Sequence, residues 1–244
     1  MPTGSQICYG IKRSTARPRL YISKRLRLWK RLWEKDYEDT LWCAYYLAYT
    51  LHELGKYAEA EFMLRRTLEG MKNVFGKEHP DTLRCADRLG LALSNQEQYQ
   101  EAEKMLRCVL ETRQRVLAKE DPRTLQTINN IGSVLHHQGE YAAAEEMYRR
   151  ALKGRRTVLG IEHPATLWSM NDLALLLYNQ GEDEAAKEMY QKVLEGMHTV
   201  LGKAHPDAAQ SAKNLEEALD NEEDYESADE MYWQARKVLE AALD

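Results

Sequence analysis

The feature that most constrains the fold of this chain is a 42-residue period that runs through most of its 244 residues. The segment 121–163 reads DPRTLQTINNIGSVLHHQGEYAAAEEMYRRALKGRRTVLGIEH, and similar segments lie 42 residues before and after it. A fixed period of this size is typical of a solenoid, in which each unit packs only against its neighbours. The positions that recur in register are Pro80, Pro122, Pro164 and Pro206, Leu51, Leu93, Leu135, Leu177 and Leu219, Ala60, Ala102, Ala144, Ala186 and Ala228, and Met63, Met105, Met147, Met189 and Met231.

Each unit is predicted to contain two helices joined by a short turn. In each unit after the first, the first helix opens at the recurring proline, whose missing N–H and fixed φ suit the first helical position. The residue before that proline is the expected N-cap, either Asp121 or a histidine at 79, 163 or 205. Apolar residues at helical spacing then predict an all-α fold with helices of about 15 and 19 residues. The glycines expected to end the first helix are Gly55, Gly139 and Gly181.

The period divides the chain into three parts. Residues 1–18 have no period and contain Gly, Ser and Pro, so we expect a disordered basic tail there. Residues 19–36 carry apolar residues at helical spacing and match the second half of a unit, so we expect a half-repeat helix that caps the array. The five repeats that follow are residues 37–78, 79–120, 121–162, 163–204 and 205–244.

Two other interpretations of the basic helix at 19–36 stay open. Its Trp- and Leu-containing face also fits an amphipathic helix that binds calmodulin or a membrane surface. Residues 1–33 contain no Asp or Glu, as in import signals, so part of a transit peptide is the third interpretation. Register with the repeats favours packing on the array, because Tyr21, Leu26, Trp29, Leu32 and Trp33 align with Met63, Leu68, Met71, Val74 and Phe75.

Charge is distributed unevenly along the chain. The net charge of −5 combines 10 Lys/Arg and 2 Asp/Glu in residues 1–36 with 24 and 37 in the remainder. Such an acidic body would repel phosphates, so nucleic acid is not expected as a partner. No apolar run approaches the ~18 residues of a membrane-spanning helix, so stable membrane insertion is not expected either. With a mean hydropathy of −0.66 and no secretory signal, a soluble cytoplasmic protein is predicted.

No arrangement of residues in the sequence indicates catalysis. The chain contains no GxxxxGK[ST], no GxGxxG after a strand, no HExxH and no CxxC. The histidines His79, His163 and His205 stand at one repeat position, at least one full repeat apart, which is too far for the ~2.1 Å bonds of a shared zinc ion. We therefore expect no enzymatic activity, no metal site and no cofactor.

The repeat resembles the tetratricopeptide repeat, whose motif is W-x₂-L-G-x₂-Y…A-x₃-F. Its 42-residue period, its HPDTL-type helix start, its QGEYAAAE turn and its VLGIEHP end are similar to the light chain of kinesin. The same long repeats occur in the sensor arrays of nucleotide-switch signalling proteins. The resemblance implies a right-handed α-solenoid of tetratricopeptide-like helix pairs that serves as a binding scaffold. The motif positions of the third unit are Ile128, Ile131, Gly132, Leu135, Ala144 and Tyr148, of which Gly132 and Ala144 match outright.

The candidate functional surface is the face of each first helix that points away from its own unit, which lines the concave groove in repeats of this kind. In the resembled family, an asparagine just before a Leu-Ala or Leu-Gly pair hydrogen-bonds the main chain of an extended peptide. An amide offers a donor and an acceptor together, which suits a peptide backbone. Among the five repeats, Asn130 and Asn214 match. The corresponding positions hold Tyr46, Arg88, Asn130, Asp172 and Asn214.

Aromatic and polar side chains on the same face complete the predicted groove. Large amphipathic rings are common at binding interfaces. The alternative for the tryptophans Trp42 and Trp168 is that they only bridge neighbouring helices. The predicted groove residues are Trp42, Tyr45, Tyr49, Arg84, Arg88, Asn129, Asn130, His137, Trp168, Asn171, Asp172 and Asn214.

These features predict a scaffold that binds a protein or peptide ligand in the groove of a repeat solenoid. One alternative is a structural or oligomerising repeat segment of a larger signalling protein, with no ligand of its own, because the repeats begin in mid-unit. A third and more distant interpretation is an accessory subunit of an enzyme.

Overall fold

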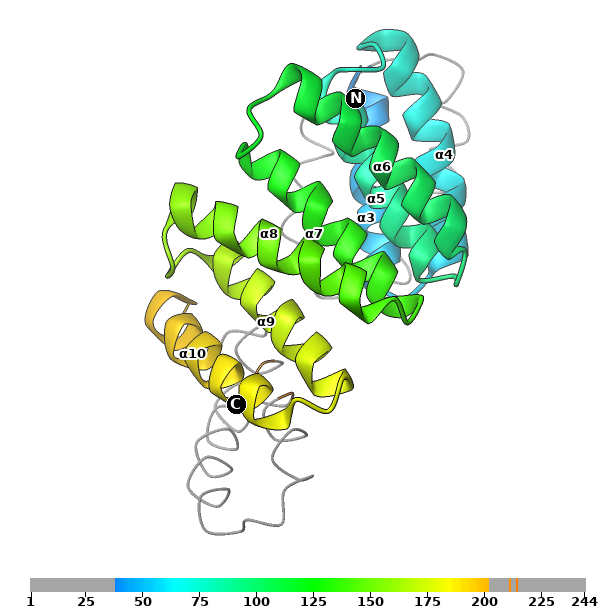
Figure 1. The fold of residues 1–244 in the computed structure, drawn as a ribbon. Coiled ribbons are helices and arrows are strands. Elements are labelled where there is room, and N and C mark those ends of the chain that lie inside the picture. Colours follow the sequence, from blue (N-terminus) through cyan, green and yellow to red (C-terminus); the bar gives the residue numbers. More distant parts are fainter. Residues whose placement is uncertain (1–37, 202–210, 212–213, 215–244) are drawn as a thin grey trace. The chain divides into compact units, whose positions relative to one another are not determined.

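The computed structural model describes residues 38–201 together with Ser211 and Asn214. The regular elements within these residues are all α-helices, which confirms the predicted all-α fold (Figure 1). The predicted tail at 1–18, the half-repeat helix at 19–36 and most of the fifth repeat at 205–244 lie outside the described residues. The helices are α3 (Glu38–Glu53), α4 (Tyr57–Val74), α5 (Pro80–Ser94), α6 (Tyr99–Val116), α7 (Pro122–His137), α8 (Tyr141–Leu159), α9 (Pro164–Asn179) and α10 (Asp183–Leu201).

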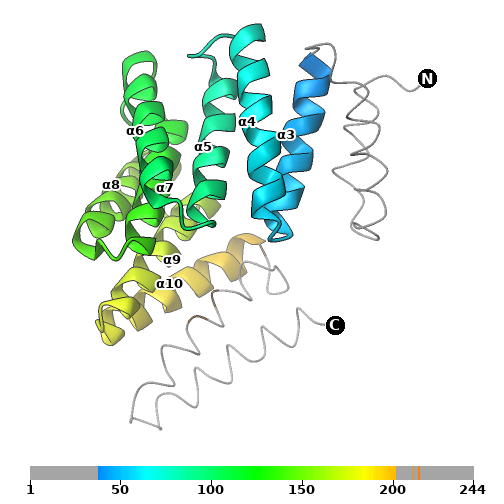
Figure 2. The same cartoon turned by 90° about the vertical axis from the view of Figure 1, so that its right-hand side faces the viewer.

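The chain forms two compact units, Met1–Val116 (unit 1) and Leu117–Asp244 (unit 2). In unit 1, α3 packs on α4, α4 on α5 and α5 on α6, and α3 also contacts α5 (Figure 2). In unit 2, α7 packs on α8, α8 on α9 and α9 on α10, and α7 also contacts α9. Within residues 38–201, each unit therefore contributes two helix pairs, and the first helices of these consecutive pairs contact each other.

Three first helices begin at the recurring proline, as the sequence predicts. Pro80, Pro122 and Pro164 each occupy the start of a helix, and the side chain of the preceding residue accepts a hydrogen bond from a backbone N–H of the first turn. This bond satisfies a donor that has no partner inside the helix. The bonds run from Asp81 N to His79 Nδ1 (3.3 Å), from Arg123 N to Asp121 Oδ1 (2.9 Å) and from Ala165 N to His163 Nδ1 (3.1 Å).

The turn between the two helices of a repeat requires a residue with positive φ. Gly55, Gly139 and Gly181 take this place with φ of 72°, 80° and 79°, and glycine adopts it freely because it has no Cβ. In the second repeat the equivalent residue is Glu97, which holds a φ of 62°. The left-handed conformation costs an L-residue with a Cβ roughly 1–2 kcal/mol, so this turn of unit 1 is strained.

The recurring leucines and alanines form the core of both units. The leucines are at most 2% exposed and the alanines are fully buried. The first and second helices of a pair approach so closely at Gly132 that an added Cβ would lie 2.8 Å from Cδ1 of Tyr148. The fold therefore needs a small residue there. The core residues of these two series are Leu51, Leu93, Leu135 and Leu177, and Ala60, Ala102, Ala144 and Ala186.

Candidate functional site

Four aromatic side chains cluster on α3 in unit 1. Trp42 meets Tyr45 edge-on and stacks on Tyr46, with ring centroids 6.0 Å apart in both pairs. Tyr45 and Tyr46 are in edge contact at 5.5 Å. Tyr49 follows one turn later and exposes 38% of its surface. Spacings of three and four residues place these rings side by side on the helix, which explains the cluster.

Two arginines of α5 lie over rings of α3. The guanidinium of Arg84 is 4.8 Å from the ring centroid of Trp42 and 5.4 Å from that of Tyr45. The guanidinium of Arg88 is 4.4 Å from the ring centroid of Tyr49. Each such contact stabilises by about 0.5–1 kcal/mol at exposed sites. We call Trp42, Tyr45, Tyr49, Arg84 and Arg88 the aromatic–arginine surface.

The members of this surface differ in depth. Tyr45 is buried, and burial raises the pKa of its phenol while the Arg88 and Arg84 charges oppose that shift. Arg84 exposes 46% of its side chain and donates to Asp81 Oδ1 at 2.8 Å. Arg88 is less exposed and lies 3.7 Å from Glu53 Oε1. The structure thus brings the five groove residues predicted for unit 1 into one cluster, in which Tyr45 is buried, Trp42 and Arg88 are half-buried, and Tyr49 and Arg84 are exposed.

The same region of unit 2 is built on a buried arginine. Arg155 of α8 is 2% exposed, and acceptors surround the two terminal nitrogens of its guanidinium, whereas its buried Nε has no hydrogen-bond partner among the described residues. Its Nη1 donates to the Ala165 carbonyl at 2.8 Å and to Ser169 Oγ at 2.6 Å, while its Nη2 donates to Gln126 Oε1 at 2.6 Å. Burying a charge is costly unless hydrogen bonds compensate for the lost water. Arg155 therefore ties α8 to both first helices of unit 2.

The predicted groove asparagines of α7 belong to this network. Ser169 Oγ donates to Asn129 Oδ1 at 2.8 Å, and Asn129 Nδ2 donates to Asp172 Oδ2 at 2.6 Å. Gln126 Nε2 donates to Asn130 Oδ1 at 2.8 Å. Burial raises the pKa of the Asp172 carboxyl, whereas the Asn129 hydrogen bond and the Arg155 charge act to lower it. The Asn129–Asp172 bond thus joins α7 to α9.

The depth of these asparagines differs from the solvated position that the sequence pattern indicates. Asn129 is 6% exposed and Asn130 is 5% exposed. Their amide oxygens already accept hydrogen bonds inside unit 2, because Arg155 and its acceptors fill the space between the helices. A contact between Asn130 and the main chain of a peptide stays a prediction.

The other groove residues predicted for unit 2 lie nearer the surface. Trp168 exposes 44% of its surface on α9. Asn171 Oδ1 accepts from Ser211 Oγ at 3.1 Å, which repeats the Ser169–Asn129 contact one repeat later. His137 is exposed, with its Nδ1 2.6 Å from the Ser133 carbonyl, and Asn214 is half-buried.

A histidine–asparagine pair that the sequence analysis did not recognise recurs in both units. Asn95 Nδ2 lies 2.8 Å from His52 Nε2, and Asn179 Nδ2 lies 2.7 Å from His136 Nε2. An amide nitrogen donates only, so each histidine accepts on Nε2 and is neutral in this arrangement. Both members recur 84 residues apart, twice the repeat length, which is the signal that could have found them.

Burial lowers the pKa of both histidines. The nearby Arg88 charge lowers the pKa of His52 further, although Glu53 acts in the opposite direction. His137 has the same lowering effect on the pKa of His136. Protonation would also remove the lone pair that accepts from asparagine. The pairs therefore hold the ends of consecutive first helices together in their neutral form.

The buried arginines also escaped sequence analysis. Arg113 of unit 1 is the equivalent of Arg155 and pairs with Asp87 Oδ2 at 2.6 Å, with both side chains under 10% exposed. In the first and fourth repeats the same position holds the methionines Met71 and Met197. An arginine at a repeat position that holds a core methionine in other repeats must be buried and must have a buried partner. The presence of arginine at this position was therefore the sequence signal for the buried network.

Two negative findings concern residues 38–201. Within them, no group of three or more His, Cys, Asp or Glu side chains is placed to hold a metal ion. Nor does any of their helices have the length and apolar character needed to cross a membrane.

Helix pairs of this kind, with capped proline starts and first helices in contact, define an α-helical repeat protein. The chain belongs to the tetratricopeptide repeat family, whose sequence profile matches residues 39–115 and 123–198. Repeats of this family generally mediate interactions between proteins and are generally non-catalytic. No curated protein matches the chain.

The fold is similar to solved structures of kinesin light chain-like repeats. One contains nearly identical tetratricopeptide-like repeats of a kinesin light chain from Podosopora anserina, with 24% identity and a TM-score of 0.64 over 80% of this chain and 92% of that one. Another is BtubC (BKLC) from P. vanneervenii, with 17% identity and a TM-score of 0.68 over 99% and 92%. The predicted tetratricopeptide fold of kinesin light chain type is thus confirmed.

Proposed function

We propose that this chain is a cytoplasmic scaffold that binds a protein or peptide ligand on its first helices and catalyses no reaction. Family membership supports protein binding in general terms. The single observation that carries the proposal further is the aromatic–arginine surface of α3 and α5, where guanidinium groups are stacked on rings.

This surface suits a peptide because Tyr49 and Arg84 are exposed and the contacts between its rings and guanidinium groups already order them. The stacking of Arg84 on Trp42 holds a long side chain in place before any ligand arrives, which lowers the entropic cost of binding. A guanidinium that lies over a ring keeps its N–H groups at the edges of its own plane, where they can donate to carboxylates or main-chain carbonyls. Tyr49 adds an exposed ring beside Arg88 as an apolar anchor.

Unit 2 contributes a different set of groups to the proposed function. Trp168 offers a second exposed aromatic anchor. Its exposed surface favours a role in ligand binding in addition to any contact that it makes between neighbouring helices. Beneath it, the hydrogen bond between Asn129 and Asp172 joins the two first helices, and we assign this network the role of keeping their surface rigid. Asn130 and Asn214 remain the proposed main-chain contacts.

The proposal can be tested with peptides selected from a random library on the immobilised full chain. Arg84→Ala should weaken binding of a selected peptide by about 1–2 kcal/mol, because it removes both a donor and the support of Trp42. Arg107→Ala is the matched control, since Arg107 is a similarly exposed arginine of α6 that pairs with Glu103. Unchanged affinity for Arg84→Ala and for Trp168→Ala, with both variants folded, would show that the ligand uses another surface.

A further inference from the structure

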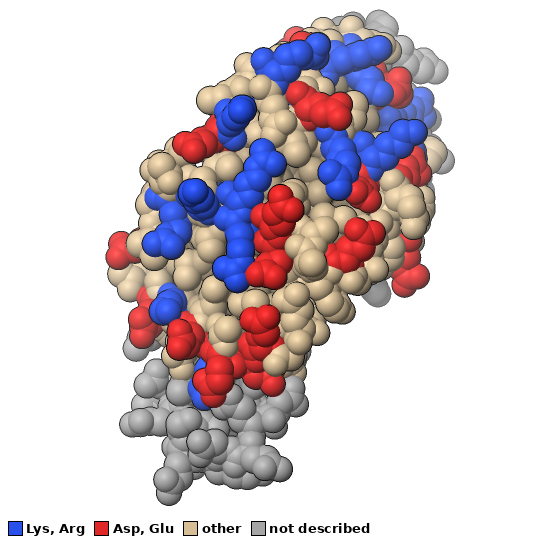
Figure 3. Space-filling model, viewed as in Figure 1, with Lys and Arg blue, Asp and Glu red and all other residues tan. Residues whose placement is uncertain are grey.

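Helix α8 carries an excess of positive charge that the second helices of neighbouring repeats do not share. It has five Lys/Arg and two Glu, whereas α4 has three of each sign and α10 has two basic and four acidic residues. Helix α6 lies between these cases, with four basic and three acidic residues. Figure 3 shows basic side chains gathered over α8 with acidic side chains beside them.

The excess depends mainly on a charge reversal at one position of the repeat. Lys153 stands where the first, second and fourth repeats hold glutamate, whereas the fifth repeat also holds a lysine, Lys237. In α4 that glutamate, Glu69, pairs with Lys72 at 2.7 Å, but the equivalents in α8 are Lys153 and Arg156, two cations that cannot pair. In the described part of the chain, neither of these two has a carboxylate within ion-pair distance. The equivalent glutamates are Glu69, Glu111 and Glu195.

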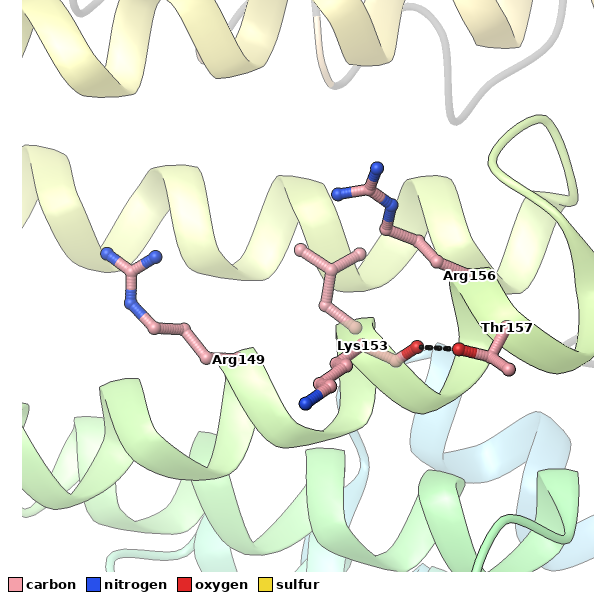
Figure 4. Close-up of a pocket in the computed structure, with 5 residues that line it drawn as sticks. Arg149, Lys153, Arg156 and Thr157 are labelled. Atoms are coloured by element: carbon pink, nitrogen blue, oxygen red, sulfur yellow. Dashed lines mark hydrogen bonds between the residues drawn. The ribbon is translucent and has the colours of Figure 1, made fainter.

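The two cations lie beside an open hollow of about 500 Å³ on α8. The guanidinium groups of Arg149 and Arg156 point to the same side of the helix (Figure 4). Arg149 is held by Glu145 at 2.6 Å, and Thr157 Oγ1 donates to the Lys153 carbonyl at 3.0 Å. Leu152 is half-buried and supplies apolar surface between the cations. The lining residues, which we call the α8 basic surface, are Arg149, Leu152, Lys153, Arg156 and Thr157.

We propose that the α8 basic surface binds a short acidic segment of a partner protein. Its lining spans about 12 Å along the helix at 1.5 Å per residue, which matches about four residues of extended chain. Arginine forks and carboxylates form charge-assisted hydrogen bonds with complementary geometry. Leu152 adds a contact for an apolar residue within the acidic segment.

Charge balance favours an acidic protein segment over a nucleic acid. Nucleic-acid binders commonly neutralise about 6–10 phosphates along a continuous backbone. The α8 basic surface offers three cations, one of them already bonded to Glu145, and the chain as a whole carries a net charge of −5. A short basic site in an acidic protein suits a short ligand. The site lies on a second helix and uses no residue of the aromatic–arginine surface, so it stands or falls separately from the proposed function.

The test uses the full chain and a fluorescein-labelled peptide of repeated Glu-Glu-Leu, with repeated Gln-Gln-Leu as the neutral control probe. Lys153→Glu installs the residue that three of the other repeats carry, and the new carboxylate can pair with Arg156 as Glu69 does with Lys72, so the fold is retained. Its affinity for the acidic peptide should fall by about tenfold or more. The control is Lys104→Glu on α6, which makes the same change of net charge at an exposed lysine and should alter affinity by less than about twofold.

Three results would overturn the proposal. The first is equal binding of the acidic peptide by the parent and by Lys153→Glu. The second is equal affinity of the parent for the Gln-containing and Glu-containing peptides. The third is binding of a short single-stranded DNA or of phosphatidylserine vesicles that is tighter than peptide binding and is lost in Lys153→Glu, which would assign the surface to another class of partner.

Discussion

The two units bury an arginine at the same repeat position but surround it with different chemistry. In unit 1, Arg113 forms a direct ion pair with Asp87. In unit 2, the equivalent Arg155 donates to neutral oxygens of Gln126, Ser169 and a backbone carbonyl, and the nearest carboxylate of its network, Asp172, is reached only through hydrogen-bonded side chains. The two units thus have an arginine at the same repeat position, but its hydrogen-bond acceptors differ between them.

The surfaces above these arginines differ in a parallel way. The first helices of unit 1 present rings and stacked guanidinium groups, whereas those of unit 2 contain amides that are bonded inside the unit, with Trp168 exposed beside them. A ligand bound to unit 1 would therefore meet donors and apolar anchors, and a ligand bound to unit 2 would meet an aromatic anchor. Similar helices can thus present different binding chemistry.

The largest expected difference between the units is in the loss of stability when each buried arginine is replaced by methionine. Methionine is the residue found at the same position of the first and fourth repeats, as Met71 and Met197. Arg113→Met leaves the Asp87 carboxylate buried without its cation, so the free energy of unfolding should fall by about 3–5 kcal/mol. Arg155→Met leaves only neutral acceptors, so the loss should be about 1–3 kcal/mol. Denaturant unfolding combined with amide hydrogen exchange would assign each loss to its own unit.

The double replacement Asp87→Asn with Arg113→Met is the control for this comparison. It removes both charges of unit 1 and should recover much of the stability lost in Arg113→Met, because no unpaired carboxylate remains. Equal losses for the two single arginine variants would mean that the ion pair and the neutral network contribute alike.

A smaller effect is expected at the helix-pair turns, where Glu97 of unit 1 takes the place of Gly139 in unit 2. Glu97→Gly should stabilise unit 1 by about 0.5–1 kcal/mol, since relief of the left-handed strain exceeds the added freedom of the unfolded chain. The reverse exchange, Gly139→Glu, should destabilise unit 2 by about 1 kcal/mol. Thermal melting of both variants tests this, and a destabilised Glu97→Gly variant would show that the glutamate side chain has a stabilising contact.

The smallest expected effect is a shared pH dependence of the histidine–asparagine pairs. His52 and His136 have a lower pKa in the folded chain than the value of about 6.5 in the unfolded chain, so just below pH 6.5 the unfolded chain binds more protons. Their stabilising contribution is therefore complete above that pH and decreases as the pH falls through it. His52→Gln keeps an acceptor for Asn95 and should flatten the pH dependence of unfolding measured between pH 7 and 5.

That measurement also compares the units directly. His136→Gln should flatten the dependence of unit 2 in the same direction, since Asn179 repeats the role of Asn95. A pH dependence that persists unchanged in the double variant would assign it to other groups.

The sequence was sufficient to predict what depends on local order along the helix. The starts at Pro80, Pro122 and Pro164 follow from proline and its capping neighbour, and the grouping of Trp42, Tyr45 and Tyr49 follows from their spacing on one helix. Such features need no knowledge of how one helix packs against the next.

The sequence was insufficient where depth depends on a neighbouring helix. Asn129 and Asn130 have the spacing of surface residues, yet both are buried. Ser169 of α9 donates a hydrogen bond to Asn129, and Arg155 of α8 donates to Ser169, so the neighbouring helices supply polar partners at this depth. An arginine considered without its neighbours is expected at the surface. The burial of Arg155 follows only from the positions of its hydrogen-bond acceptors on other helices. Comparison of the repeats with one another would have marked it.

The central claim is that the first helices carry the ligand, and photo-crosslinking tests it most directly. A peptide selected on the full chain would carry benzoylphenylalanine in place of an apolar residue, and crosslinked sites would be mapped by mass spectrometry. Crosslinks are expected on the exposed faces of the first helices, on α3 and α5 at Tyr49 for a peptide bound to unit 1, or on α7 and α9 at Trp168 for a peptide bound to unit 2. Crosslinks confined to α4, α6, α8 and α10 would contradict it.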